Sequence, residues 1–190
     1  MRRMIYTARD TGERFFEKGL SHSRQEKVLL RIYPEETRQK ILGFGGAFTD
    51  TAAMALFHMN KDMQESALNA YFNSETGLSY NMGRVPIGCC DFSTIEYSHA
   101  EVPEDKELSF FSIEQDKRGI IPLIREAKRI IEKSSSKEEL LLYALPWSPP
   151  GWMKTNGQMN WGGRLCQEYY ETMAAYLIKF IEAYEKEEIQ

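Results

Sequence analysis

Two stretches of the sequence carry side chains that could bind a polar ligand. The first, Leu145–Gly157 (LPWSPPGWMKTNG), holds Trp147 and Trp152 on either side of two adjacent prolines, and the second is the dipeptide Asp91–Phe92. An indole face packs against the C–H face of a sugar ring, and a carboxylate accepts hydrogen bonds from hydroxyl groups. These residue types favour a sugar as the ligand. The competing interpretation, that both tryptophans only plug one end of a protein core, has equal weight on the residues alone.

Arg84 is the cation that could act beside these residues. It lies in the middle of an apolar stretch, Leu78–Gly88, which is expected to form a buried strand. A buried arginine needs a carboxylate partner. Asp91 follows seven residues later, on the opposite face of the sheet by strict alternation, unless a bend at residues 88–90 brings both to one rim. Two interpretations remain: a structural ion pair, or an arginine that keeps a catalytic carboxylate ionised while Asp91 hydrogen-bonds a polar ligand.

Other motifs speak against several kinds of chemistry. The glycine-rich run Gly43–Phe48 (GFGGAF) lacks the spacing of a dinucleotide-binding motif and the Lys-Ser/Thr pair of a P-loop, so a tight turn with close backbone packing is favoured. No G-x-S-x-G motif supports a serine nucleophile. The three histidines have no paired spacing and are expected at the surface or at helix caps: His22, His58 and His99.

The composition is that of a globular protein with a net negative charge. The 190 residues carry a formal charge of −4, and no basic block indicates a nucleic-acid partner. The three cysteines, Cys89, Cys90 and Cys166, have no metal-ligand spacing. Neither a secretory leader nor an apolar run long enough to span a bilayer occurs. We therefore expect reduced thiols, no membrane span and a cytoplasmic location.

Alternating strands and helices must position the candidate side chains. Strands are expected at residues 27–33, 40–43, 78–88 and 140–144, and helices at 51–56, 61–72, 120–131 and 169–184. This alternation implies right-handed βαβ crossovers and a parallel sheet. Polar and aromatic residues at the carboxyl ends of successive strands are typical of the functional face of a (β/α)8 barrel, but a doubly wound sheet shows the same alternation.

The number of βα units in the chain is relevant to the choice between a barrel and an open sheet. A barrel needs eight βα units and about 250 residues. Residues 43–188 hold only three such units. The chain is therefore either an open α/β sheet or the front part of a larger protein.

Three long motifs occur in order along the chain: GFGGAFTDTAA (Gly43–Ala53), YNMGRVPIGCCDFS (Tyr80–Ser93) and LPWSPPGWMKTNG (Leu145–Gly157). Together they resemble family 30 of the glycoside hydrolases, the group of glucosylceramidases, bacterial β-glucosidases and β-1,6-glucanases. The resemblance implies that residues 43–190 form the first three βα units of a (β/α)8 TIM barrel, an α/β fold truncated before strand 4. It implies that residues 1–42 supply N-terminal strands of a β-sandwich side domain.

The resemblance also implies retaining hydrolysis of a β-glycoside without a metal or cofactor. In such enzymes two carboxylates, an acid/base and a nucleophile, lie roughly 5–5.5 Å apart. No Asn-Glu-Pro motif of the family occurs here, and both catalytic glutamates are expected beyond Gln190. Only binding roles are therefore implied: Asp91 hydrogen-bonds the sugar, Trp147 packs on it, Phe92 lines the same pocket, and Arg84 lies near the catalytic carboxylates.

We expect this chain to be the N-terminal part of a retaining β-glycosidase that acts on β-glucosides, either glucosylceramide-like or β-1,6-glucan-like. Its partners would be a carbohydrate or glucoside substrate and the missing C-terminal part of the barrel. Without the two glutamates, the chain alone is expected to be inactive and poorly stable. The alternatives are a non-catalytic sugar-binding module and a barrel that a separate chain completes.

Overall fold

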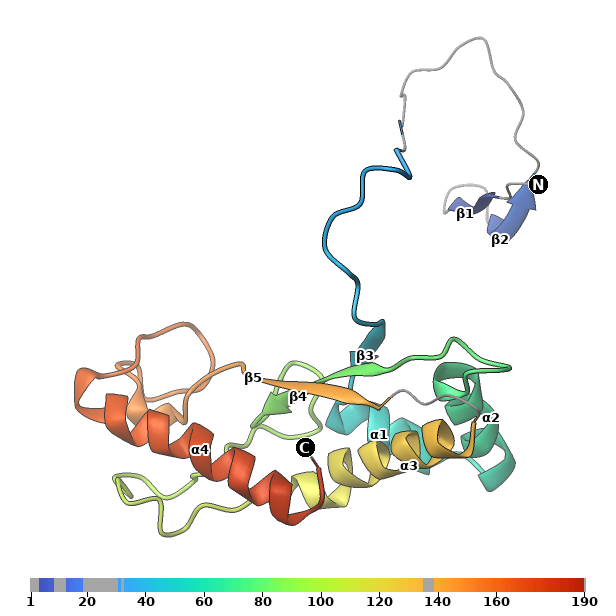
Figure 1. Ribbon diagram of the computed structural model, residues 1–190. Helices are drawn as coiled ribbons and strands as arrows, with labels where there is room; N and C mark the ends of the chain where they lie inside the picture. Colours follow the sequence, from blue (N-terminus) through green and yellow to red (C-terminus); the bar gives the residue numbers. More distant parts are fainter. Residues whose placement is uncertain (1–3, 9–12, 19–30, 32, 135–138, 190) are drawn as a thin grey trace. The chain divides into compact units, whose positions relative to one another are not determined.

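The computed structural model describes residues 4–8, 13–18, 31, 33–134 and 139–189 (Figure 1). The chain divides into two units, residues 1–40 and residues 41–190. The candidate site residues all belong to the second unit.

The first unit contains a two-stranded antiparallel pair, β1 (Met4–Ala8) with β2 (Glu13–Lys18). The pattern of residues predicted neither strand, because this part of the sequence is polar and mixed, although the family resemblance implied strands within residues 1–42. Most of the expected strand at 27–33 lies outside the described residues. Tyr33 instead opens a turn, in which the N–H of Glu36 donates to its carbonyl at 3.1 Å. The assignment of this region to a β-sandwich stays a prediction.

The second unit is built on a parallel sheet in the order β3 (Gly45–Ala47), β4 (Met82–Ile87), β5 (Leu141–Pro146). The expected strand at 40–43 is wrong, because β3 begins further along, within the glycine run. A Cβ atom on Gly45 would overlap the carbonyl group of Met82 on β4. Glycine is therefore what allows β3 to approach β4, which agrees with close backbone packing as the role of GFGGAF.

Among the described residues of the second unit, four α-helices accompany the sheet: α1 (Asp50–Phe57), α2 (Lys61–Phe72), α3 (Ile120–Lys133) and α4 (Tyr170–Lys186). The same residues include short 3-10 helices at Asp116–Arg118, Gly151–Met153 and Gln167–Tyr169. The start of α1 follows from its cap, because Thr49 Oγ1 accepts the N–H of Ala52 at 3.2 Å. Asn60 caps α2 in the same way through Met63. The expected helix at 61–72 is confirmed to the residue.

The winding of the second unit separates the two candidate architectures. Its strands follow one another in sequence order across the sheet, and the helices lie on one side of it (Figure 1). A doubly wound sheet reverses its strand order and places helices on both faces. A singly wound sheet with one covered face is the arrangement of a (β/α)8 barrel. The helix-facing side chains Val85 and Ile87 of β4 belong to the same buried core as Ile121 and Ile124 of α3.

The far face of the sheet is uncovered by the described residues. The expectation that residues 140–144 form a buried strand is wrong for most of its length: Leu140 is buried, but Leu141, Tyr143 and Leu145 are each about half exposed. Strand β5 has β4 on one side, and no described strand pairs with its other edge. The apolar side chains of β5 therefore stay partly exposed, because no described residue covers this face or pairs with the free edge of the strand.

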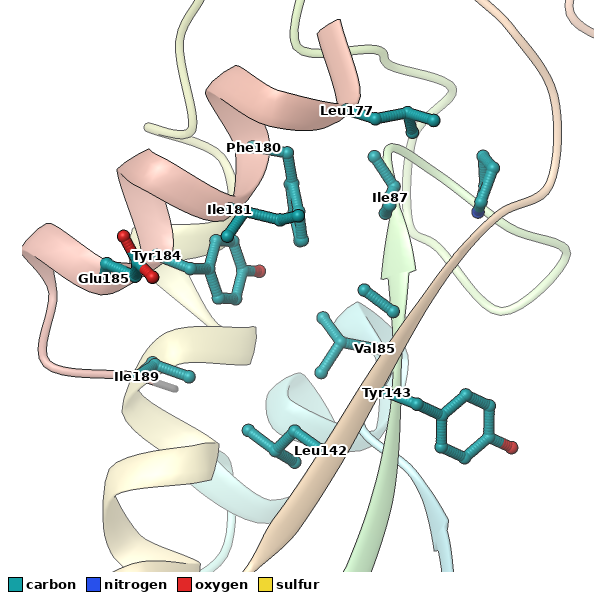
Figure 2. Close-up of a pocket in the computed structure, with 12 residues that line it drawn as sticks. Val85, Ile87, Leu142, Tyr143, Leu177, Phe180, Ile181, Tyr184, Glu185 and Ile189 are labelled. Atoms are coloured by element: carbon teal, nitrogen blue, oxygen red, sulfur yellow. The ribbon is translucent and has the colours of Figure 1, made fainter. Parts of the chain in front are cut away.

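An apolar groove of about 680 Å³ lies beside this edge, between the strands and α4 (Figure 2). We call it the α4 groove. Val85 and Ile87 of β4 face Phe180 and Ile181 of α4 across it, whereas Tyr143 points away from the helix (Figure 2). No helix among the described residues is long and apolar enough to cross a membrane.

Candidate functional site

A cavity of about 500 Å³ lies where the segments that follow β4 and β5 meet, and we call it the rim pocket. It brings together two residues singled out from the sequence, Asp91 and Trp147. The other lining residues come from the same two segments: Cys89, Cys90, Ser93, Thr94, Ile95, Glu96, Ser148, Met159, Asn160 and Trp161. The carboxyl ends of parallel strands are where barrel enzymes carry their sites.

Asp91 reaches the rim through a bend directly after β4. Gly88 has φ of +80°, a conformation that glycine adopts without steric cost, and a Cβ atom there would lie 3.3 Å from the carbonyl of Tyr97. The next residues form a turn, in which the N–H of Ser93 donates to the carbonyl of Cys90 at 3.0 Å. The bend that the sequence left open at residues 88–90 is present, and Asp91 is exposed to solvent after it.

Trp147 is one of the two tryptophans that line the rim pocket. Its side chain is 41% exposed, and Cζ of Arg84 lies 5.2 Å from the centroid of its ring. This is a cation–π distance. Arg84 and Tyr143 are partners in the parallel register, so Arg84 projects on the uncovered face of the sheet.

A structural ion pair of Arg84 with a carboxylate, one of the two interpretations left open by the sequence, is not found among the described residues. Its Nε atom is buried and has no hydrogen-bond partner in the described part of the chain. Buried donors are almost always satisfied. Arg84 therefore presents an unused donor beside Trp147, which lines the rim pocket.

The two tryptophans of the loop have different environments. Trp152 Nε1 donates to the carbonyl of Ala100 at 2.8 Å, and its ring packs edge-to-face against Tyr169 at 5.1 Å between centroids. It belongs to the packed interior rather than to the rim pocket. The structure therefore places Trp147, but not Trp152, at the rim pocket, and the packing of Trp152 is that of the plug interpretation.

Buried Lys154 shapes the loop that carries Trp147. Its Nζ donates to Ser148 Oγ at 3.0 Å and to the carbonyl of Met159 at 2.8 Å. These bonds join the two ends of the loop across the rim pocket, since Ser148 and Met159 both line it. Lys154 therefore links two residues that line the rim pocket without lining the pocket itself.

Phe92 does not line the rim pocket. Its side chain is 58% exposed, and its carbonyl accepts the N–H of Thr51 at 3.1 Å, close to the start of α1. The structure thus places Asp91 and Trp147 at the rim pocket, with Arg84 in contact with Trp147. Phe92 lies outside this group.

Sequence reasoning missed three residues that line the rim pocket: Glu96, Asn160 and Trp161. The Nδ2 group of Asn160 donates to a carboxylate oxygen of Glu96. Trp161 is 90% exposed and has φ of +62°. The available signal was the third tryptophan of the sequence, which stands directly before two glycines.

A buried polar network centred on Asp116 begins at Tyr97, the residue that directly follows Glu96 of the rim pocket. Its Oδ1 accepts the hydroxyl of Tyr97 at 2.7 Å, and its Oδ2 accepts Tyr184 at 2.7 Å and lies 2.9 Å from His99 Nε2. The hydroxyl of Tyr176 lies 3.2 Å from His99 Nδ1. Burial is the main cause that raises the pKa of the three tyrosines well above its usual range.

The expected surface position of His99 is therefore wrong. Only 1% of this residue is exposed, because its partners come from a distant segment and from α4. His58, in contrast, is the C-cap of α1 as expected, with Nδ1 2.7 Å from the carbonyl of Met54. His22 lies outside the described residues.

The Cys, His, Asp and Glu side chains of the described residues are the candidates for metal ligands. Burial raises the pKa of the Cys89 thiol, which disfavours the thiolate that would bind a metal. In the described ranges, no three His, Cys, Asp or Glu side chains gather in a way that could hold a metal ion.

Residues 41–190 match the model of the glycosyl hydrolase family 30 TIM-barrel domain. The chain is 40% identical over 164 residues to the lysosomal acid glucosylceramidase of Mus musculus, covering 84% of this chain and 31% of that protein. The crystal structure of SrfJ from Salmonella typhimurium matches with a TM-score of 0.78 and 31% identity, over 99% of this chain and 41% of that chain. The endo-β1,6-glucanase BT3312 matches with a TM-score of 0.71 and 30% identity, over 83% and 35%.

This chain spans about a third of the length of the curated relatives that it matches. The similarity to solved structures extends over the parallel sheet and its helices. The strand order and the single helix-covered face described above are therefore those of a TIM-barrel portion.

Proposed function

The chain belongs to glycosyl hydrolase family 30, and on that premise we propose that it supplies the sugar-binding side of a retaining β-glucosidase-type active site. One ring of a β-glucoside would lie on the indole of Trp147, with hydroxyl groups donating to the carboxylate of Asp91. The relatives support this substrate class, since one is named a glucosylceramidase and another an endo-β1,6-glucanase.

The observation that carries the proposal is the rim pocket itself. It joins the half-exposed face of Trp147 to the solvent-exposed carboxylate of Asp91, at the carboxyl ends of two neighbouring parallel strands. An aromatic face beside a hydrogen-bonding carboxylate suits a ligand with one apolar face and equatorial hydroxyl groups.

Arg84 supports a further part of the proposal, namely that the catalytic carboxylates come from other βα units of the barrel. Its buried Nε lacks a partner among the described residues, and its guanidinium already lies against Trp147. A carboxylate placed beside it would satisfy this donor and stay ionised, as a nucleophile requires. We further propose that the α4 groove receives the next βα unit, which would pair with the edge of β5 and cover Ile181.

Titration of the 190-residue chain with methyl β-D-glucoside tests the binding role. We expect saturable binding that Trp147→Ala weakens by about 3- to 10-fold, because an aromatic contact contributes about 0.5–1.5 kcal/mol. Asp91→Asn should weaken it as well. Phe110→Ala is the matched control, since Phe110 is exposed but does not line the rim pocket. Equal affinities for all four proteins would refute the role of the rim pocket.

A non-catalytic sugar-binding module is the second candidate, favoured by the fact that the rim pocket is formed within this chain. A nitrophenyl β-glucoside assay on the same preparation addresses catalysis. We expect no turnover above background, because removal of the carboxylates costs most of a glycosidase's rate enhancement. Turnover by the purified chain would contradict the proposed dependence on further barrel units. Binding that is unaffected when those units are supplied would favour the module.

A further inference from the structure

Trp161 is the most exposed of the large apolar side chains in the described part of the chain, at 90%. Isolated exposed apolar residues are common on protein surfaces, but this one lines a cavity that also contains Trp147 and Asp91. A tryptophan exposes a large apolar face to water at considerable cost. Its position in the rim pocket places this face where a ligand of the pocket would contact it.

The loop around Trp161 is held in place by side chains. Asn156 Nδ2 donates to the carbonyls of Asn160, at 2.9 Å, and Gly162, at 3.3 Å, on either side of the tryptophan. Asn160 in turn donates to Glu96 on the opposite wall of the pocket. The indole is therefore presented by a tethered turn and not by a free chain.

The backbone of Trp161 adopts a conformation that bulky residues rarely occupy. Its φ of +62° lies in the left-handed region, which is costly for a residue with a Cβ atom. Glycine stands at the next two positions, Gly162 and Gly163, also with positive φ. A tryptophan kept at the strained position of this turn is the kind of outlier that marks a functional site.

The polar groups around Trp161 indicate what covers it. The carboxylate of Glu96 and the amide of Asn160 border the same space, and both would be desolvated by a hydrocarbon chain without gaining hydrogen bonds. A sugar ring instead offers a C–H face to the indole and hydroxyl groups to the carboxylate. A carboxylate that accepts one bond from Asn160 retains lone pairs for such hydroxyls.

We propose that Trp161, together with Glu96 and Asn160, forms a second sugar subsite beside the one at Trp147 and Asp91. The ligand that fills the rim pocket is then an oligosaccharide of at least two β-linked glucose units, rather than glucose on an alkyl or lipid chain. This inference rests on the proposed function, because it requires the first ring to occupy Trp147.

Calorimetric titrations with three probes test the subsite: methyl β-D-glucoside, octyl β-D-glucoside and gentiobiose, a β-1,6-linked glucose disaccharide. In Trp161→Ala we expect gentiobiose to bind about 3- to 10-fold more weakly and both monosaccharide glycosides to be unaffected. Trp161→Phe should retain part of the gentiobiose affinity, because a smaller aromatic face remains. Phe110→Ala is again the control.

Each other outcome identifies which idea fails. If Trp161→Ala weakens octyl β-D-glucoside as much as gentiobiose, an alkyl chain covers the indole and the second subsite is refuted. If Trp161→Ala changes no affinity while Trp147→Ala weakens all three probes, the second subsite fails and the proposed function stands. If Trp147→Ala has no effect either, or the unmodified chain binds none of the probes, both fail together.

Discussion

The guanidinium of Arg84 lies over the indole of Trp147, with Cζ 5.2 Å from the ring centroid. The two residues come from adjacent strands or their ends, 63 positions apart in the numbering of the sequence. Arg84 lies in strand β4, and Trp147 lies in the loop that follows β5. Their contact therefore joins residues from two separate sequence motifs. One edge of the rim pocket is thus built by a contact that neither motif specifies.

This contact predicts opposite effects of Arg84→Met on binding and stability. Loss of the guanidinium that lies against the indole of Trp147 should weaken the binding of methyl β-D-glucoside, because the ring is no longer held in place. The thermal unfolding midpoint should stay unchanged or rise, because removal of a buried donor without a partner, which costs about 1–3 kcal/mol, offsets the lost cation–π contact of about 0.5–2 kcal/mol. Calorimetric binding and circular dichroism melting measure the two effects. A lower midpoint would show that Arg84 is satisfied by a group outside those described here.

Asp116 is expected to dominate the stability of the region behind the rim pocket. In Asp116→Ala, two tyrosine hydroxyls and His99 Nε2 lose their buried acceptor. We expect a loss of at least about 3 kcal/mol, because each buried hydrogen-bonding group left without its partner costs about 1–3 kcal/mol. Glu114→Ala is the control, because Glu114 pairs with Lys117 at the surface, a contact worth less than about 1 kcal/mol. Urea unfolding followed by circular dichroism provides the comparison, and similar losses in both variants would contradict the central role of Asp116.

Alkaline titration should distinguish the buried tyrosines from the exposed ones. The pKa of Tyr97, Tyr176 and Tyr184 is raised in the folded state above the ordinary value of about 10, mainly by burial. Their neutral hydroxyls therefore contribute stability fully below pH 10, and this contribution is lost as pH rises above 10. Absorbance at 295 nm should rise in two phases, the second coinciding with loss of the circular dichroism signal. A single gradual phase without unfolding would contradict the buried network.

Tyr169 provides an internal reference for this titration. A hydrogen bond to Glu104 raises the pKa of its phenol to about 12. Glu104→Gln should return the Tyr169 transition towards pH 10 without changing the phase that accompanies unfolding. Difference spectra between the two proteins measure this shift.

The α4 groove predicts self-association of the isolated chain. An apolar groove of about 680 Å³ next to an unpaired strand edge favours contact with a second molecule. Ile181→Glu should lower the association measured by sedimentation velocity. Ile178→Glu is a matched control on the same helix, because Ile178 is 56% and Ile181 55% exposed, but Ile178 does not line the groove. A monodisperse monomer that unfolds cooperatively would argue against this prediction and against the expected low stability.

The helices and the family were accessible from the amino-acid sequence. Thr49 and Asn60 mark the starts of α1 and α2 because a side-chain oxygen accepts the N–H of a residue only three positions away. The three motifs likewise contain β3, β4, the bend at Gly88 and six of the residues that line the rim pocket: Cys89, Cys90, Asp91, Ser93, Trp147 and Ser148. These features depend on neighbours along the chain, so local patterns are sufficient for them.

The burial of individual side chains could not be inferred from local sequence patterns. Trp147 and Trp152 stand five residues apart in one motif, yet one is half exposed and the other donates to Ala100, 52 residues away. His99 is buried because Tyr176, 77 residues further on, reaches it from α4. The apolar strand β5 is exposed because no described element covers it. Whether a side chain is a ligand surface, a plug or part of a buried network depends on partners brought close by folding, and the spacing of residues contains no record of those partners.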